Sequence, residues 1–517
     1  MKLKFPLNFL ILPLLFAGSV VIPFEEIQLS AQCPPPIPPP NPFKESKKKK
    51  KKSEPAKEMS HRLIIVEAGT KKIEPKTFQG YPKLKKISLP EGLEEIGDLA
   101  FANCPELNNI EIPSSVTVIG KNAFQNCTDI FRLDLPEGIT EIPEGLFRNC
   151  RSLHNVRIPE GVTKIGKGAF SGCTSLKRLK LPASIEIIEE DAFKGCTALD
   201  EIQLPENLQD IGKNAFAGCT TLPALKIPAG FTEWKLNPFS GCKRLILSVP
   251  EDHPSFTSKN GFLFNKDQTS LLFVPCWKRI PSIVFPKTLT SIGTGAFMSC
   301  EYLRAVVLHA DITELGDEAF ADCPNLVLIQ FKNPAIKIGK KCFQGCTGLK
   351  SMVLPGECTE LPEGIFSGCT KLQQVTLPSS LTVIGNSSFE KCTGFREFKF
   401  PESLTKIGKK AFSGCTDLDQ LNIPDSVAEI GEGAFEKCIS LKDIKLPAGM
   451  TEVKKETFAG CIDLRKLELP DSVNLIEPGA FDQCLRLRKV ISRNEDLAED
   501  PAVFKKPLEL VRPKKNP

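Results

Sequence analysis

The sequence predicts a solenoid built from parallel strands, and three observations lead to this prediction. A Cys recurs every 23 residues in two unbroken series, one from Cys104 to Cys242 and one from Cys300 to Cys484. Each Cys closes an Ala-Phe-x-x-Cys motif or a close relative of it, and a short apolar stretch that usually ends in Pro precedes each motif. A repeat of this length is too small to bury its own apolar face, so it packs against its neighbours.

The first half of each repeat is predicted to be a strand. In LKRLKLPASIEIIEEDAFKGC, which starts at Leu176, Leu179 and Leu181 are separated by the spacing that places side chains on one face of a strand. Arg178 and Lys180 therefore point the other way, toward solvent. The Pro that follows has no N–H to donate and ends the strand.

The second half of the same repeat is predicted to return to the core through turns. Ile185 and Ile188 point inward, Ala192 leaves room, and Phe193 fills the core before Cys196 closes the coil. Burying Phe193 fully is worth about 1.5 to 3 kcal/mol. The same aromatic position recurs from Phe78 to Phe239 and from Phe297 to Phe504.

These repeats resemble the BspA-type, or treponemal-type, leucine-rich repeat family. Two segments carry the resemblance with little alteration, LHNVRIPEGVTKIGKGAFSGC and LDQLNIPDSVAEIGEGAFEKC, and the pattern covers about residues 62–507. The resemblance implies a right-handed arc of the α/β type with a parallel β-sheet on its concave face and short turns or 3-10 segments on its convex face. It also implies secreted or cell-surface proteins that bind host, matrix or neighbouring-cell molecules.

The Gly of the Ile-Gly pair is replaced in several repeats. Its position is occupied by Pro143, Glu189, Lys235, Pro362, Lys454 and Glu477. A left-handed backbone conformation is therefore not required in every turn.

The repeat register breaks once, between Cys242 and Cys300. The intervening residues 249–284 contain Asn260-Gly261, a strong two-residue hairpin turn, flanked by strand-like apolar runs. The sequence therefore predicts a hairpin insertion between an N-terminal repeat block, residues 62–248, and a C-terminal block, residues 285–507. Two roles stay open for the hairpin: it bridges the two blocks, or it protrudes to contact a ligand.

Residues 1–31 have the pattern of a signal peptide. Two Lys residues precede an apolar run that is short and contains a Pro, and Leu29-Ser30-Ala31 resembles a cleavage site. Lipid anchoring at Cys33 is disfavoured, because Gln32 stands where a small residue is needed.

Residues 32–61 are predicted to be a disordered linker. Pro-rich sequence favours extended polyproline II, and the six like charges of Lys47 to Lys52 repel one another. The linker is either a solvated spacer or an electrostatic attachment to an anionic envelope, which salt would weaken. Residues 508–517 form a polar tail.

Composition narrows the classes of function. The net charge is +5 and most of it lies in the first sixty residues, so the repeats are nearly neutral and nucleic-acid binding has no electrostatic support. The four His residues fall in unrelated places, and no nucleophile elbow, phosphate-binding loop or HExxH motif is present. We expect no enzymatic activity, no cofactor and no metal site.

The 20 cysteines do not have the spacing of a zinc framework. The 23-residue series places one Cys above the next in a column with a spacing of about 4.8 Å. We expect a ladder of buried free thiols that behave as small hydrophobic groups. Occasional disulfide pairing is the alternative, there or at the cysteines outside the series: Cys33, Cys276, Cys342 and Cys358.

The predicted binding surface is the concave face, at the strand positions that point to solvent. The N-terminal block leans basic there, through Arg157, Arg178 and Lys180 among others. After the interruption Ala305, Val307, Leu328 and Val353 are apolar at solvent positions, and a contiguous apolar patch on a soluble protein usually marks a contact site. The alternative is that the hairpin covers these residues.

These observations favour a secreted or surface-displayed binding protein for a protein or glycan ligand. The alternative is a structural spacer, or an effector scaffold that binds a host protein after export.

Overall fold

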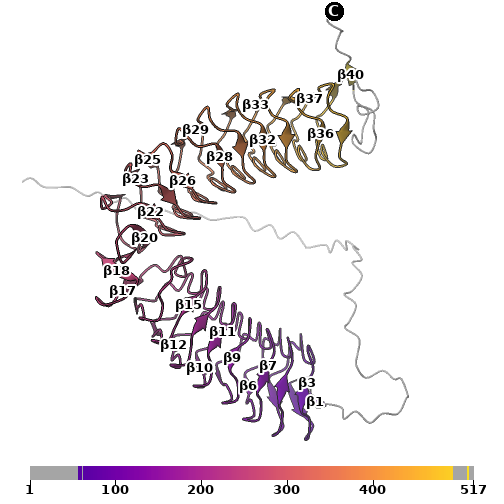
Figure 1. Ribbon diagram of the computed structural model, residues 1–517. Coiled ribbons are helices and arrows are strands. Elements are labelled where there is room, and N and C mark those ends of the chain that lie inside the picture. Colours follow the sequence, from indigo (N-terminus) through magenta and orange to yellow (C-terminus); the bar gives the residue numbers. More distant parts are fainter. Residues whose placement is uncertain (1–55, 61, 493–508, 512–517) are drawn as a thin grey trace, which may run out of the picture. The chain divides into compact units, whose positions relative to one another are not determined.

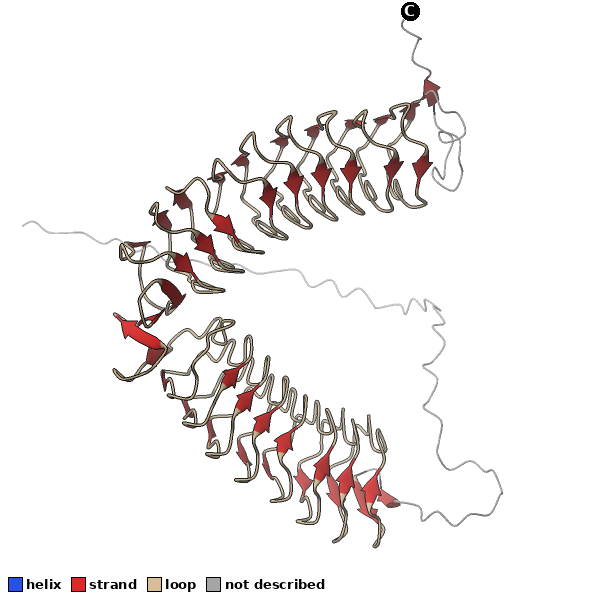
Figure 2. Cartoon of the chain, viewed as in Figure 1, coloured by secondary structure: helices blue, strands red, loops and turns tan. Residues whose placement is uncertain are grey.

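The protein is described by a computed structural model that covers residues 56–60, 62–492 and 509–511. These residues form stacked coils of short strands and turns, and none of them lies in a helix (Figures 1 and 2). The leucine-rich repeat solenoid predicted from the 23-residue period is therefore confirmed. The predictions for the signal peptide, for Cys33, for Lys47 to Lys52 and for Phe504 lie outside the described residues.

Most coils contain two strands. In the repeat that starts at Leu176, β12 (Arg178–Leu179) comes first and β13 (Ile187–Ile188) follows after a turn. Leu179 is buried and Arg178 is exposed, as the alternation of the sequence predicts. Phe193 is fully buried. The strands of successive coils stack in parallel, and most neighbours pair, which produces two ladders.

The first ladder follows the Leu-rich half of each repeat. Its strands are β2 (Leu63–Val66), β4 (Lys86–Ser88), β6 (Asn109–Ile110), β8 (Arg132–Asp134), β10 (Asn155–Arg157), β12, β14 (Glu201–Ile202), β16 (Ala224–Lys226), β17 (Ile246–Ser248), β21 (Ser282–Ile283), β23 (Ala305–Leu308), β25 (Leu328–Phe331), β27 (Ser351–Val353), β29 (Gln374–Thr376), β31 (Glu397–Lys399), β33 (Gln420–Asn422), β35 (Asp443–Lys445), β37 (Lys466–Glu468), β39 (Lys489–Ile491) and β40 (Glu509–Val511). Not all neighbouring strands of the first ladder pair with each other. For example, β12 pairs with β14, but β10 does not pair with β12.

The second ladder follows the Ile-Gly half of each repeat. Its strands are β3 (Lys72–Ile73), β5 (Glu95–Ile96), β7 (Val118–Ile119), β9 (Glu141–Ile142), β11 (Lys164–Ile165), β13, β15 (Asp210–Ile211), β22 (Ser291–Ile292), β24 (Glu314–Leu315), β26 (Lys337–Ile338), β28 (Glu360–Leu361), β30 (Val383–Ile384), β32 (Lys406–Ile407), β34 (Glu429–Ile430), β36 (Glu452–Val453) and β38 (Leu475–Ile476). The resemblance to the repeat family implies only turns or 3-10 segments after the first strand. The second ladder corrects this, whereas the concave placement of the first ladder stays a prediction.

Where the Gly of the Ile-Gly pair is present, close packing favours it, whereas its backbone conformation does not demand it. A Cβ at Gly120 would lie 2.4 Å from the backbone N of Asp98 in the preceding coil. The second ladder is interrupted before β9, β28 and β36, which precede Pro143, Pro362 and Lys454. Each of these three interruptions of the second ladder therefore lies at a coil in which a larger residue replaces the Gly. Glu189 and Glu477 also replace it, but β13 and β38, which precede them, still pair with the strand of the previous coil.

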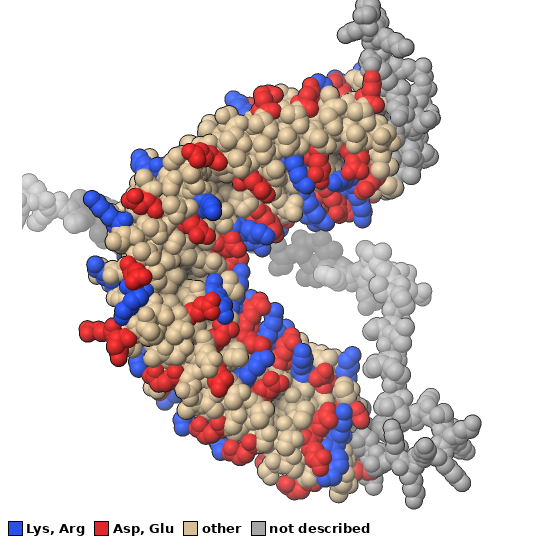
Figure 3. Space-filling model, in the orientation of Figure 1, with Lys and Arg blue, Asp and Glu red and all other residues tan. Residues whose placement is uncertain are grey.

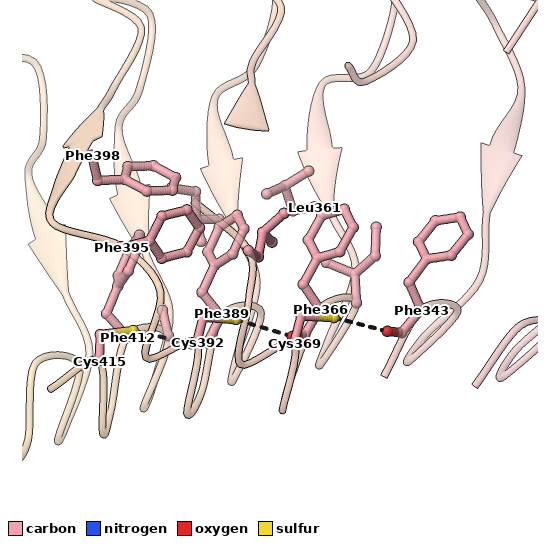
Figure 4. Close-up of a cluster of buried hydrophobic side chains, with 14 of the residues drawn as sticks. Phe343, Leu361, Phe366, Cys369, Phe389, Cys392, Phe395, Phe398, Phe412 and Cys415 are labelled. Carbon is pink, nitrogen blue, oxygen red and sulfur yellow. Dashed lines mark hydrogen bonds between the residues drawn. The ribbon is translucent and has the colours of Figure 1, made fainter. Parts of the chain in front are cut away.

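The core of each block contains a column of stacked Phe rings beside a column of thiols. Ring centroids of neighbouring coils lie close together, for example 5.4 Å between Phe101 and Phe124. Most of these thiols donate to a backbone carbonyl oxygen, as Cys127 does to Phe101 and Cys369 does to Phe343, both at 3.1 Å (Figure 4). None of the cysteines in the described part of the chain forms a disulfide. The expected ladder of buried free thiols is confirmed for these residues.

The insertion contains a three-stranded meander. Asn260 and Gly261, both with positive φ, form the turn between β18 (Phe256–Lys259) and β19 (Phe262–Asn265), and β20 (Ser270–Phe273) follows. β20 pairs in parallel with β22, the first second-ladder strand of the C-terminal block. The hairpin predicted from the sequence is confirmed, and it extends the second ladder.

The insertion bridges the cores of the two blocks. Leu263 and Leu272 pack into the N-terminal core, whereas their neighbours Phe264 and Leu271 pack into the C-terminal core. This alternation follows from the strand geometry, in which successive side chains point to opposite faces. Of the two roles left open by the sequence, the structure favours bridging.

Polar contacts also join the two blocks directly. Lys213 Nζ lies 2.7 Å from Glu318 Oε1, and Asn237 Nδ2 donates to the carbonyl oxygen of Gly295 at 2.7 Å. Glu318 is mostly buried and Asn237 is buried. These contacts replace the 23-residue stacking at the one place where the register breaks.

The ends of the described chain extend the first ladder. Ala56–Ser60, which the sequence analysis placed in the linker, form β1 and pair antiparallel with β2. Glu509–Val511, which it placed in the polar tail, form β40 and pair in parallel with β39.

Candidate functional site

The apolar residues predicted after the interruption lie on the outer face of the first ladder. Ala305 of β23 pairs with Leu328 of β25, so their side chains are direct neighbours. Val307 is 43% exposed, Leu328 45% and Val353 64%, and Ala305 is partly exposed. Val307 and Val353 lie on either side of Gln330, which occupies the same register position on the strand between them.

Two further residues belong to this surface, and neither is among the site residues predicted from the sequence. Val284 is 94% exposed and lies 23 residues before Val307, in the same register position. Val327 is 52% exposed and precedes Leu328 on the same turn. The repeat register could have found Val284, but the altered spacing across the interruption hid the alignment. We call the six residues Val284, Ala305, Val307, Val327, Leu328 and Val353 the apolar patch.

The insertion does not cover the apolar patch. Its β18–β20 meander joins the second ladder through β20 and β22, whereas the patch lies on the first ladder, to which β21 at the end of the insertion also belongs. Because the patch residues stay exposed, the alternative in which the hairpin folds over them is wrong. Solvent positions elsewhere on the first ladder are mostly polar, as in β33, where Gln420 and Asn422 are exposed.

The basic residues predicted to contribute to binding lie on the first ladder of the N-terminal block, and each has an acidic partner. Arg157 pairs with Glu137, Arg178 Nε lies 3.1 Å from Glu201, and Lys180 lies 3.9 Å from Glu160. Basic and acidic side chains are interspersed over the face shown in Figure 3. The sequence suggested a surface that leans basic, but these ion pairs neutralise much of its charge. The structure does not bring the basic residues into contact with the apolar patch.

The thiols do not form a reactive or metal-binding site among the described residues. Burial raises the pKa of Cys196 to about 12 and that of Cys104 to about 11, so both stay protonated at neutral pH. No group of His, Cys, Asp and Glu in the described part of the chain is arranged to hold a metal ion. His253 is buried in the insertion, and His154 is exposed and stacks on Phe131 with centroids 5.3 Å apart.

None of the residues that the structure describes forms a helix long and apolar enough to cross a membrane.

The two strand ladders, the Phe and thiol columns and the exposed strand face define a leucine-rich repeat scaffold. The model of the BspA type leucine rich repeat region matches this chain in overlapping segments: residues 57–177, 132–246, 272–396 and 382–505. The chain therefore belongs to the BspA-type leucine-rich repeat family. Leucine-rich repeat proteins generally mediate protein–protein interaction and are typically non-catalytic scaffolds.

Solved structures with a similar chain include three bacterial leucine-rich repeat proteins. A protein from Bacteroides ovatus is 25% identical over 80% of this chain and 83% of its own, with a TM-score of 0.32. A leucine-rich cell surface protein from Faecalibacterium prausnitzii is 23% identical over 86% and 82%, with a TM-score of 0.29. A protein from Eubacterium ventriosum is 18% identical over 81% and 90%, with a TM-score of 0.40. No curated protein matches the chain.

Proposed function

We propose that this chain is a secreted or cell-surface binding protein that holds a protein partner against the apolar patch. One observation carries the proposal: Val284, Val307, Leu328 and Val353 are exposed at strand positions that are mostly polar elsewhere on the ladder. Covering such side chains gains about 25 cal/mol per Å² of apolar surface. The patch favours a protein over a glycan, because protein interfaces have an apolar centre with a polar rim.

The paired basic residues have a smaller part in this proposal. Arg157, Arg178 and Lys180 are exposed, but their acidic partners reduce the field that a distant partner would sense. We expect them to change the association rate and its salt dependence slightly, and to leave the dissociation rate nearly unchanged.

The experiment introduces charge into the patch. We expect the double variant Leu328→Asp, Val353→Asp to lose binding to matrix or host-cell extracts and to keep its thermal stability, because neither side chain is buried. Gln420→Asp with Asn422→Asp is the matched control, since these residues occupy the same two register positions on β33. Normal binding by the patch variant would place the binding surface elsewhere.

Secretion and attachment are tested separately. A surface protein would be accessible to added protease on intact cells, whereas delivery into another cell's cytosol would support the alternative of an exported effector scaffold. If Lys47 to Lys52 attach the protein to an anionic envelope, deleting them releases it and salt elutes the intact protein. Retention that resists salt would contradict electrostatic attachment and would favour lipid anchoring at Cys33.

A further inference from the structure

His253 is buried at the point where the chain leaves the N-terminal block and enters the insertion. It lies in the short segment between β17 and β18 (Figure 1), and only 1% of its surface is exposed. A ring that is buried this completely must satisfy both of its nitrogen atoms. Its surroundings therefore have to match one particular protonation state.

The contacts of the ring fix that state. The main-chain N–H groups of Ser255 and Phe256 both donate to Nδ1, each at 3.2 Å, so Nδ1 accepts and carries no proton. Nε2 lies 3.1 Å from the carbonyl oxygen of Pro228, which can only accept, so Nε2 carries the proton. The buried ring of His253 is therefore the neutral Nε2–H tautomer, and it joins the insertion to a coil of the N-terminal block.

This ring holds the first strand of the meander against the N-terminal block. Phe256, whose N–H group it accepts, is the first residue of β18 and is buried in the core of that block. The centroid of the Phe256 ring lies 5.1 Å from that of His253 and 6.3 Å from that of Trp234. The same meander contributes Phe264 and Leu271 to the C-terminal core. Releasing His253 would therefore loosen the joint between the two blocks.

The charged residues around His253 do not stabilise a protonated ring. Its polar contacts are the three given above, and no carboxylate in the described part of the chain is among them. Lys266 Nζ donates to the carbonyl oxygen of His253 itself at 2.8 Å and to that of Glu251 at 3.0 Å. A proton on Nδ1 would therefore face two N–H donors and add a positive charge beside that of Lys266. The other charged side chains of the surrounding segments face solvent or pair with each other: Glu251, Asp252 and Asp267, and the pairs Lys226–Glu206 and Lys235–Glu233.

We propose that His253 acts as a pH-sensitive switch that keeps the meander docked on the N-terminal block at neutral pH and releases it in mild acid. In the docked state two N–H donors occupy Nδ1, so a proton binds only after β18 has moved away and the ring meets water. A His side chain in water takes up a proton at about pH 6.5. The released state therefore binds more protons, and the docked state is lost as the pH falls through about 6.5. If the docked ring binds no proton, the ratio of released to docked molecules rises about thirtyfold from pH 7.5 to pH 5.0.

His309 in the C-terminal block has the opposite surroundings and provides a control. Its Nε2 lies 3.2 Å from the carbonyl oxygen of Pro286, and its Nδ1 lies 3.4 Å from a carboxylate oxygen of Asp311. Both neighbours accept hydrogen bonds, so a second proton on this ring gains a partner instead of losing one. Acid is therefore expected to act on the meander through His253 and to leave the coil of His309 docked.

The test measures hydrogen exchange of the full chain by mass spectrometry, with each rate divided by the rate of an unstructured chain at the same pH. We expect the protection of β18 and β19 to fall about thirtyfold from pH 7.5 to pH 5.0, and that of β11 and β13 to stay unchanged. In His253→Asn protection should be lower but the same at both pH values, because Asn accepts the two N–H bonds, leaves Pro228 unpaired and does not titrate. His309→Asn is the matched control and should retain the thirtyfold fall. Protection that does not change with pH in the unmodified chain, or an equal fall in His253→Asn, would overturn the proposal.

A second measurement decides the question if His253→Asn does not fold. The sequence contains four His residues, so nitrogen NMR of the labelled, unmodified chain can resolve their rings. His253 should be the Nε2–H tautomer at pH 7.5, and its protonated form should appear only together with the loss of protection in β18 and β19. A protonated His253 in a chain that keeps this protection would contradict the proposal. Leu328→Asp with Val353→Asp should retain the acid response, so the outcome does not depend on the proposed function of the apolar patch.

Discussion

Cys276 Sγ donates a hydrogen bond to the carbonyl oxygen of Cys242 at 3.4 Å. Cys276 does not belong to either 23-residue series, so the spacing predicts that it lies outside the ladder. In the structure it lies between Cys242 and Cys300 and continues the thiol column across the interruption. The thiols thus act as buried donors to main-chain carbonyl groups, and this role determines how they should react and titrate.

Native thiols should resist alkylation. The thiolate is the nucleophile, and burial raises the pKa of Cys196 to about 12 and that of Cys346 to about 12, so almost no thiolate exists at pH 8. We expect mass spectrometry to find the buried ladder cysteines unmodified in native buffer and fully modified in denaturant. Cys358 is less buried and provides an internal control that should react sooner. Fast native modification of Cys196 would contradict a buried ladder.

Stability should fall at alkaline pH. The pKa of Cys196 rises from 9.0 to about 12 on folding, so the unfolded chain loses this proton first as the pH rises. The contribution of the neutral thiol is therefore fully present below about pH 8 and is lost as the pH rises through 9 toward 12. Urea unfolding at several pH values should show this decline, and Cys196→Ala should decline less steeply than the unmodified chain. Equal slopes would contradict the linkage.

Removing one ring from the Phe column should loosen the coils beside it. We expect Phe193→Ala to cost about 3 to 5 kcal/mol, because the ring is fully buried between Phe170 and Phe216. Hydrogen exchange should accelerate first in the adjoining coils, since each repeat contacts only its neighbours. Phe131→Ala is the control, because that ring is mostly exposed and should cost less than about 0.5 kcal/mol. Uniform loss of protection over all coils would contradict the solenoid behaviour.

Breaking the Lys213–Glu318 ion pair should uncouple the two blocks. We expect Lys213→Met to lower the free energy of unfolding by about 1 kcal/mol, because the mostly buried carboxylate of Glu318 then has lost its cationic partner. Asp322 lies close to Glu318, and its pKa is already raised by burial and by the charge of Glu318. Calorimetry should then resolve two unfolding transitions. Lys167→Met removes an equally short pair with Glu190 that is half exposed, and it should cost less than about 0.5 kcal/mol. Equal effects of the two variants would show that the first pair has no special role.

Much of the fold could be predicted from the sequence, because each repeat carries its own pattern. The alternation of Leu179 and Arg178, the buried position of Phe193 and the turn at Asn260-Gly261 depend on near neighbours along the chain and on the recurring period. The second ladder was missed because its strands are only two residues long, as in β13, and their pairing partner lies 23 residues away.

The candidate site was predicted only in part. The exposed positions of Val307, Leu328 and Val353 followed from the strand period, but Val284 was missed because the register changes across the interruption. The carboxylates that face Arg178 and Lys180 belong to neighbouring coils, so the loss of basic character could not be recognised within one repeat.

The sequence by itself determined what repeats: the 23-residue coil, the Phe and Cys columns and the one break in register, since all of these are set by local spacing and by packing on an identical neighbour. Only the tertiary structure decided what happens where neighbours differ. The division of Leu263 and Phe264 between two cores depends on the shape and volume of side chains in adjacent coils. Packing between unlike neighbours is a property of both surfaces together, and a period in one sequence does not contain it.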